Sequence, residues 1–389
     1  MPRPIPGGFP RRRLLQGAAA LGSASLVSGF GLRRLMAGAG PSGRRFVFVY
    51  VPGGWDQLLF LDPREFEYTV PADGYAKEVE RTGIDTSYTR GSNDLTARFG
   101  AQLNRPSNAP AGFAFGPVAV DRTGGQVAKA PSLVSLYEQG VPMAIVRGMN
   151  MGTLGHEPGY AYMLTGEPAV GSSARGTSMP IRLAAGLGKA GQPVADAVVS
   201  VIAMGVQSFT GSESGRYAAL QLGNADDIGR VLQRPAALTH ASEVEAALAA
   251  YATQSLAEAV APYDGQGLVA QLRAAEERTH GLLSSQLIER FTFATGQDAE
   301  SKAIRARYGI PEGASALSTP VTAAFVAQTI KHGLAQFQSV VFGGGGDSHF
   351  GGNKDHAQGL HGALAALSAL IDDLKNTPAP ASLGGSWMD

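Results

Sequence analysis

The sequence predicts an α/β fold with a mostly parallel sheet flanked by helices. Residues 46–51, FVFVYV, form a continuous apolar run of β-branched and aromatic residues, which is typical of a strand buried on both faces of a parallel sheet. Helical and strand patterns then alternate along the chain, as they do in α/β proteins. With 389 residues, the chain is also long enough to bury a sizeable core.

The remaining elements are predicted from apolar spacing and from the glycines that stop each run. The predicted pairs of helix and following strand are 132–139 and 141–148, 181–188 and 194–205, and 321–337 and 338–346. A last helix over 357–375 is indicated by one apolar stripe, which consists of Leu360, Leu364, Leu367, Ile371 and Leu374. Residues 61–130 are rich in Pro, Gly, Asn and Asp and predict an irregular excursion.

The chain divides into a leader, residues 1–40, and one α/β domain, residues 41–389. Within the domain, residues from about 225 to 310 are rich in Ala, Glu and Gln with helical spacing, which predicts a helical insertion or outer layer. In the leader, Arg11, Arg12 and Arg13 precede a short, mildly apolar stretch. This pattern indicates a twin-arginine export signal, and hence a periplasmic or extracellular protein without a stable membrane span. A basic disordered tail is the alternative interpretation.

Charge and cysteine content exclude several classes of function. The 32 basic and 32 acidic residues cancel, and no basic run lies beyond the N-terminus, so we do not expect a nucleic-acid partner. The absence of cysteine excludes disulfides, thiolate zinc sites and thiol nucleophiles. Any metal must therefore be held by oxygen atoms and imidazoles.

The unusual polar residues fall in segments that follow predicted strands. Asp56 follows the first strand, His156 follows the strand that ends at Gly148, and Asp347 with His349 follows the last strand. Ligands of open α/β sheets bind beyond the carboxyl ends of the strands, so these loops are expected to converge. Asp56 could equally cap a turn, and His156 could be a surface histidine. The four-glycine run before Asp347 favours a functional site there.

Two histidines belong to the last predicted helix. His356 projects onto the apolar stripe and therefore points inward, where it is either a metal ligand or a hydrogen-bonded core histidine. His361 lies about 100° from the centre of the stripe, which favours a solvated flank. Asp355 is most simply an acid at the N-terminus of the helix.

Asp and His donors without cysteine suit zinc first, with manganese, iron or calcium as alternatives. Glycine-rich loops and helix N-termini suit an anion. Together they predict a metal-assisted hydrolase of a small phosphate or sulfate ester, in which the ion polarises the ester or activates water. The alternative is a non-catalytic exported protein that keeps the fold for binding or assembly.

Several motifs, taken in order, resemble a known family. They are the twin-arginine leader, FVFVYVPGGWDQL, LYEQGVPMAIVRGMN, and GGGGDSHF followed by HGALAALSALIDDLK. They are similar to the exported bacterial family called domain of unknown function 1501, which is placed in the alkaline phosphatase and sulfatase superfamily. The resemblance runs from about residue 44 to 376. It implies an alkaline phosphatase-like fold and a site with one or two metals, to which Asp56, Asp347, His349 and His156 are carried over.

The chain departs from the family pattern in two places. HEPGYAYMLTG looks like the sulfatase signature, but His156 stands where sulfatases place their nucleophile, so His156 is a ligand, a base or the trace of a lost activity. The family continues after the helix at 357–375 with another strand and an Asp-His ligand pair, whereas this chain ends at GGSWMD. We therefore expect either a truncated gene product or a protein partner that covers the open sheet edge.

Overall fold

A computed structural model gives the fold of the chain. It describes residues 45–53, 106–110, 113–116, 131–146, 152–153, 155–171, 173–189, 199–232, 290–343, 353–380 and 384–388. The predicted leader and three of the predicted metal ligands, Asp56, Asp347 and His349, lie outside these residues. His156 and His356 lie within them.

The centre of the fold is a parallel sheet, which confirms the predicted α/β class. Its four strands are β1 (Phe46–Tyr50), β2 (Val199–Met204), β3 (Leu220–Leu222) and β4 (Ala335–Val341). They are ordered β1-β4-β2-β3, and every neighbouring pair is parallel. The last strand in sequence therefore lies between the first two, and the carboxyl ends of all four strands face the same edge.

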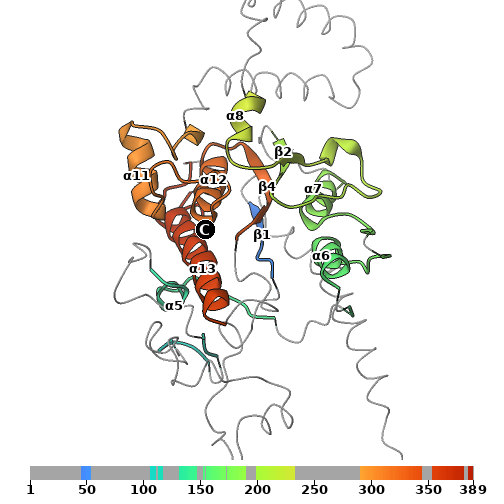
Figure 1. The fold of residues 1–389 in the computed structure, drawn as a ribbon, viewed down its shortest axis with the longest axis horizontal. Helices are drawn as coiled ribbons and strands as arrows, with labels where there is room; N and C mark the ends of the chain where they lie inside the picture. Colours follow the sequence, from blue (N-terminus) through green and yellow to red (C-terminus); the bar gives the residue numbers. More distant parts are fainter. Residues whose placement is uncertain are drawn as a thin grey trace, which may run out of the picture.

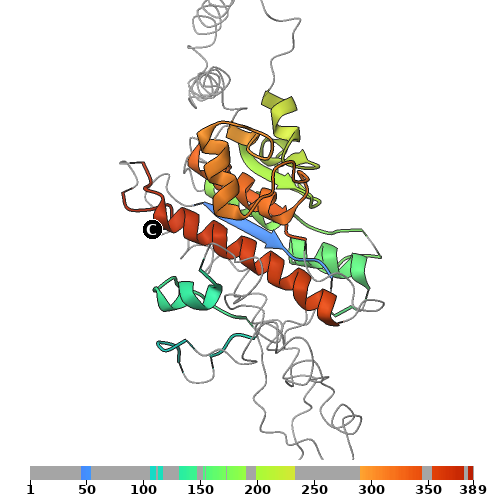
Figure 2. The ribbon, with the colours of Figure 1, turned by 60° about the vertical axis from the view of Figure 1, so that its left-hand side comes forward.

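Helices cover both faces of this sheet (Figure 1). One layer consists of α11 (Ala299–Tyr308), α12 (Thr319–Lys331) and α13 (Asn353–Asn376), and α7 (Met179–Lys189) lies on the opposite face. The short helix α5 (Leu133–Glu138) packs against α13 on its far side from the sheet (Figure 2). The remaining described helical elements are α6 (His156–Thr165), the 3-10 turn η4 (Gly215–Tyr217) and α8 (Asp227–Leu232).

The alternation of side chains along β4 explains the two layers. Phe337 packs into the cluster formed with α7, whereas Val340 packs into the cluster formed with α12 and α13. Gln338 points to the α12 side, where its side-chain oxygen accepts a 2.7 Å hydrogen bond from the Thr329 hydroxyl. Because successive residues of a strand face opposite sides, a central strand needs buried side chains on both. Each large apolar side chain buried in this way contributes roughly 1.5–3 kcal/mol.

The helix α12 is buried on nearly its whole circumference. Every residue from Val321 to Ile330 is buried, because the sheet, α11 and α13 surround the helix. Its sequence is correspondingly apolar, with Pro320 tolerated in the first turn, where a backbone N–H has no partner inside the helix. The helix ends before Gly333, whose φ of 65° is the left-handed conformation that glycine adopts readily.

Most of the predicted elements are found, with shifted boundaries. The predicted helices at 132–139, 181–188 and 357–375 correspond to α5, α7 and α13, and the strands at 46–51 and 194–205 correspond to β1 and β2. The predicted boundary between helix and strand at 337 is wrong. The helix ends at Lys331 and β4 begins at Ala335, because the turn at Gly333 already reverses the chain.

The predicted strand at 141–148 is wrong over its described part, 141–146. These residues form no ladder with any described strand. Their side chains still alternate: Val141 is buried and Met143 is partly buried in the cluster around α5, whereas Val146 is exposed. The alternation therefore indicates an extended segment with one packed face. It does not show that the backbone of this segment pairs with another strand.

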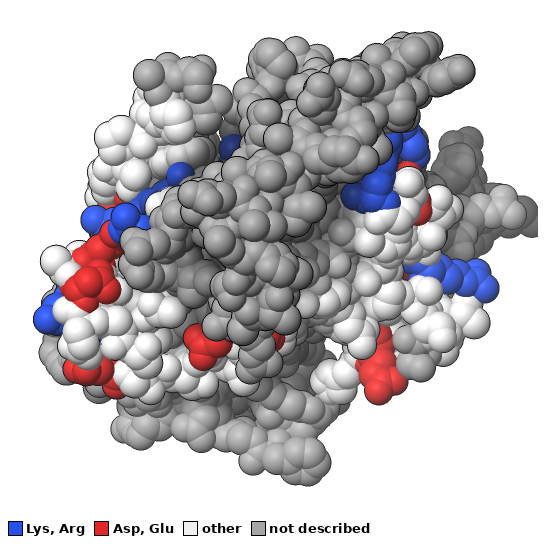
Figure 3. All heavy atoms as spheres, turned by 90° about the horizontal axis from the view of Figure 1, so that it is seen from above, with Lys and Arg blue, Asp and Glu red and all other residues white. Residues whose placement is uncertain are grey.

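The surface of the described residues carries mixed charge. On the face shown in Figure 3, acidic and basic side chains lie near one another rather than in separate patches, in agreement with the balanced composition. Within the described ranges, no helix combines the length and the apolar character that a membrane span requires.

Candidate functional site

The carboxyl ends of β1 and β4 lie side by side. Tyr50 and Val341 are partners in the parallel register, and the backbone N–H of Phe342 donates a 2.9 Å hydrogen bond to the carbonyl of Tyr50. The described chain then continues to Gly53 after β1 and to Gly343 after β4. The segments that carry Asp56, Asp347 and His349 therefore start from neighbouring positions at one edge of the sheet.

The N-terminus of α12 lies at the same edge. The hydroxyl of Thr319 donates a 3.1 Å hydrogen bond to the carbonyl of Gly343, at the exit of β4. A Cβ on Gly343 would lie 3.2 Å from that hydroxyl oxygen, so a larger residue would crowd the contact. This first glycine of the four-glycine run thus allows helix and strand exit to approach each other closely.

The helix α6, which the sequence did not predict, also packs at this edge. Its residue Tyr160 places its ring 4.9 Å from the ring of Tyr50, between centroids, and Figure 2 shows α6 just beyond the arrowhead of β1. Pro158 in the first turn and Gly166 as a left-handed C-cap are ordinary helix boundary signals. The small and aromatic residues between these two signals show no clear helical spacing, so the sequence did not predict the helix.

His156 is the first residue of α6 and is exposed. The N-cap is Gly155, which has no side chain to cap the helix, and its backbone N–H donates to the Thr153 hydroxyl at 3.1 Å. His156 therefore begins a helix, whereas the sequence had suggested that it lies in a loop. It nevertheless lies one helical turn before Tyr160, and residues four apart share a face of a helix.

The structure buries both histidines of α13. His356, in the first turn, is 4% exposed, which confirms that it points inward. His361 is 8% exposed, so its interpretation as a solvated flank is wrong. The physical reason is that α13 is covered by α12 on one side and by α5 on another, so that more than its leucine stripe is shielded from solvent.

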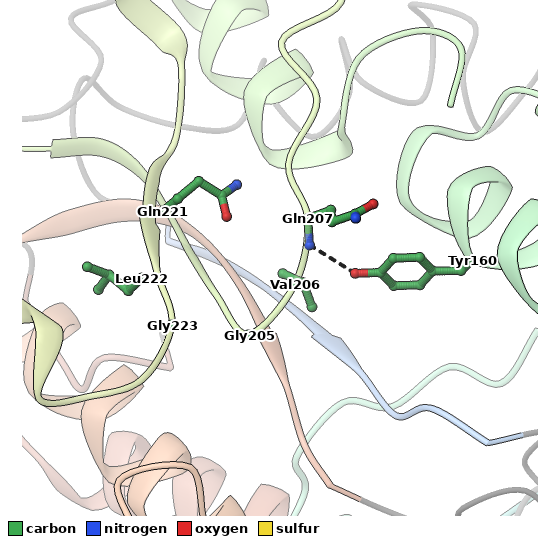
Figure 4. Close-up of a pocket in the computed structure, with 7 residues that line it drawn as sticks. All are labelled: Tyr160, Gly205, Val206, Gln207, Gln221, Leu222 and Gly223. Carbon is green, nitrogen blue, oxygen red and sulfur yellow. Dashed lines mark hydrogen bonds between the residues drawn. The ribbon is translucent and has the colours of Figure 1, made fainter. Parts of the chain in front are cut away.

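A shallow cavity of about 470 Å³, wide open to solvent, lies at the carboxyl ends of β2 and β3. It is lined by Tyr160 of α6, by residues 205–207 after β2, and by residues 221–223 at the end of β3 (Figure 4). The Tyr160 hydroxyl points into the loop after β2 and accepts a 2.9 Å hydrogen bond from the backbone N–H of Gln207. Burial raises the pKa of Tyr160 above 10.0, so the hydroxyl keeps its proton at neutral pH.

Hydrogen bonds join the loop after β2 to β3. The Gly205 N–H donates to the Leu222 carbonyl at 3.1 Å. With its amide nitrogen facing the loop, Gln221 donates to the Val206 carbonyl at 3.2 Å and accepts from the Ser208 N–H at 3.0 Å. These bonds continue the β2–β3 pairing beyond the strands. They shape one wall of the cavity.

The structure leaves the predicted metal site largely outside its described residues. Within the described part, no group of three or more His, Cys, Asp or Glu side chains is arranged to hold a metal. Asp56, Asp347 and His349 do not belong to that part, so their assignment stays a prediction. The sequence did not single out Tyr160 or Gln207. Two glycines, Gly205 and Gly223, directly follow β2 and β3. They are the sequence signals that could have indicated a cavity at the ends of these strands.

No family model, curated protein or solved structure matches this chain. The resemblance to the domain of unknown function 1501 family, and with it the alkaline phosphatase-like fold, therefore stays a prediction from the motifs. The α/β class rests on the parallel sheet itself.

Proposed function

We propose that the chain is an exported, metal-dependent hydrolase of small phosphate or sulfate esters. Asp56, Asp347, His349 and His356 hold a divalent metal in this proposal, and His156 lies at the reacting position. Zinc is the first candidate because Asp and His are its common ligands where cysteine is absent. The metal would polarise the ester or activate a water molecule.

The observation that carries the proposal is the pairing of β1 with β4. Asp56 follows Gly53 by three residues, and Asp347 follows Gly343 by four. Adjacent strands are about 4.8 Å apart, and three or four residues can span roughly 10–14 Å. Two carboxylates that leave neighbouring strands at one edge are thus within reach of one ion.

The positions of the two described histidines support a site at this same edge of the sheet. Eleven residues connect β4 to α13, and the inward-pointing His356 is the fourth residue of α13. His156 begins α6, which the Tyr50–Tyr160 contact holds at the end of β1. The N-terminus of a helix favours negative charge because its backbone N–H groups point outward. An anionic ester would be oriented by this end of α6, with His156 as a base or ligand.

Metal content of the protein purified without chelator tests the proposal. We expect close to one equivalent of a divalent metal, and cleavage of an aryl phosphate or aryl sulfate that stops when the metal is removed. Asp347→Ala should release the metal. Asp226→Ala is the matched control, because Asp226 is an exposed aspartate in the turn before α8. Wild-type protein with less than about a tenth of an equivalent would favour the non-catalytic binding protein instead.

A further inference from the structure

The cavity at the ends of β2 and β3 lies close enough to the proposed metal site to bind the part of a substrate that carries the ester. Tyr160 is four residues after His156, which is about 6 Å along α6. The strand β4 separates β1 from β2 in the sheet, so the cavity lies about 10 Å, or two strand spacings, from the end of β1. A group bound in the cavity can therefore be attached to an ester that reacts at the neighbouring edge.

The described lining of the cavity favours an uncharged ligand. None of the seven described residues that line it carries a charge. An ion bound there would give up part of its hydration without gaining an opposite charge from these residues. A volume of about 470 Å³ lies within the range of small-molecule sites, so the cavity is large enough for one ring with its substituents.

The polar groups of the lining suit a ligand with several hydroxyls. The Tyr160 oxygen accepts from the Gln207 N–H, which leaves the hydroxyl proton to donate. Gln207 is exposed, and its side chain lines the same cavity (Figure 4). An amide offers donors and an acceptor together, as paired hydroxyl groups require. Val206 and Leu222 add apolar surface to the same lining.

We propose that this cavity binds an uncharged, polyhydroxylated group such as a single sugar residue, and that this residue carries the ester. The presence of an ester on the sugar rests on the proposed function, whereas the binding of the sugar does not. The bonds of Gly205 and Gln221 to neighbouring backbone already fix one wall of the cavity, so the backbone of that wall loses little conformational entropy when the ligand binds.

Titration with methyl glucoside, a neutral sugar, tests the inference by saturation-transfer NMR or calorimetry in the presence of chelator. We expect saturable binding with a Kd of about 1 mM, as is usual for so small a ligand. Gln207→Ala and Tyr160→Phe should each weaken binding about three- to tenfold, because each removes one hydrogen-bonding group. Gln297→Ala is the control, since among the described residues this exposed glutamine bonds to Glu312 and to the Thr295 carbonyl.

Three results would overturn the inference: no saturable binding by the wild-type protein, equal affinity in Gln207→Ala, or displacement of the sugar by inorganic sulfate. Because the titration is made without metal, its outcome is independent of the metal analysis. A protein that binds the sugar but holds no metal would refute only the proposed hydrolase. A protein that holds metal but does not bind the sugar would refute only the sugar site.

Discussion

The ring of Tyr160 lies against the ring of Tyr50, with 4.9 Å between centroids and 53° between planes. Tyr50 is the last residue of β1, and the Tyr160 hydroxyl also accepts a hydrogen bond from the Gln207 N–H after β2. One side chain thus links α6 to two strand ends that are not neighbours in the sheet. This link places the first turn of α6, with His156, at the edge where the predicted ligands begin.

Tyr160→Phe should separate the two parts of this link. The variant keeps the ring contact but loses the hydrogen bond, so we expect the free energy of unfolding to fall by about 0.5–1.5 kcal/mol. Tyr160→Ala should cost at least a further 0.5–1.5 kcal/mol, because it also removes the aromatic pair. Urea denaturation measures both. Tyr162→Phe, in the same helix, is the control and should change the free energy by less than about 0.5 kcal/mol. Equal losses in Tyr160→Phe and Tyr162→Phe would contradict the role of the hydroxyl.

Gly205 should be intolerant of even the smallest side chain. Its φ is 69°, and a Cβ there would lie 2.5 Å from a methyl carbon of Val341. We expect Gly205→Ala to lower the free energy of unfolding by about 1–3 kcal/mol, from the left-handed backbone and the clash together. In Gly215→Ala, the new methyl group meets no atom within 4 Å, so this control should be nearly neutral in the same thermal or urea unfolding experiment. If Gly205→Ala left the free energy of unfolding unchanged, the loop after β2 would have to shift at little energetic cost.

The long periodic segments of the fold could be predicted from the sequence. The apolar run that forms β1 and the leucine stripe of α13 carry enough residues for their period to be recognised. The three-residue β3 is too short to show any period, and it is found only because it pairs with β2. The segment at 141–146 shows the opposite failure, because its alternation is real although its backbone has no ladder partner among the described residues.

Some features of the candidate site could likewise be predicted from the sequence, and others could not. The inward direction of His356 follows from its position on the apolar stripe of its own helix, so it could be predicted. The burial of His361 depends on α5 and α12, which are distant in sequence, so it could not be predicted. The cavity beside Tyr160 likewise combines α6 with the ends of two strands. Only the three-dimensional contact, and no local pattern, brings these parts together.

His332 should make the fold sensitive to acid. Burial, together with the nearby positive charges of Arg290 and Lys331, lowers the pKa of His332 below its ordinary value of 6.5. The unfolded chain therefore binds a proton more readily, and the stabilising contribution of the neutral imidazole is present above pH 6.5 and is lost as the pH falls through the lowered pKa. His332→Gln should flatten the loss of stability between neutral and acid pH. Urea midpoints measured across this range would contradict the assignment if wild type and variant fell in parallel.

Asp373 of α13 should be the most important charged residue for stability among those described. Its side chain is 1% exposed, and Lys331 of α12 donates to both of its oxygens at 2.7 Å. From α11, Arg307 forms an ion pair with it and Tyr308 donates its hydroxyl at 2.8 Å. Burial, and then the charge of Asp373, raises the pKa of Tyr308 well above 10.0, so this donor stays protonated. One carboxylate thus joins three helices.

Asp373→Asn should lower the free energy of unfolding by about 3–5 kcal/mol, because it leaves the largely buried Lys331 ammonium without its counter-charge. Burial already lowers the pKa of Lys331 below 10.5, and the bond to Asp373 opposes that effect. The variant should therefore lower the pKa further, which can be followed by NMR of the labelled lysine. Asp372→Asn is the control, since among the described residues the carboxylate of this half-buried neighbour bonds to Asn376, and its loss should change stability by less than about 0.5 kcal/mol. Similar stabilities for the two variants would mean that the carboxylate is not what joins α11, α12 and α13.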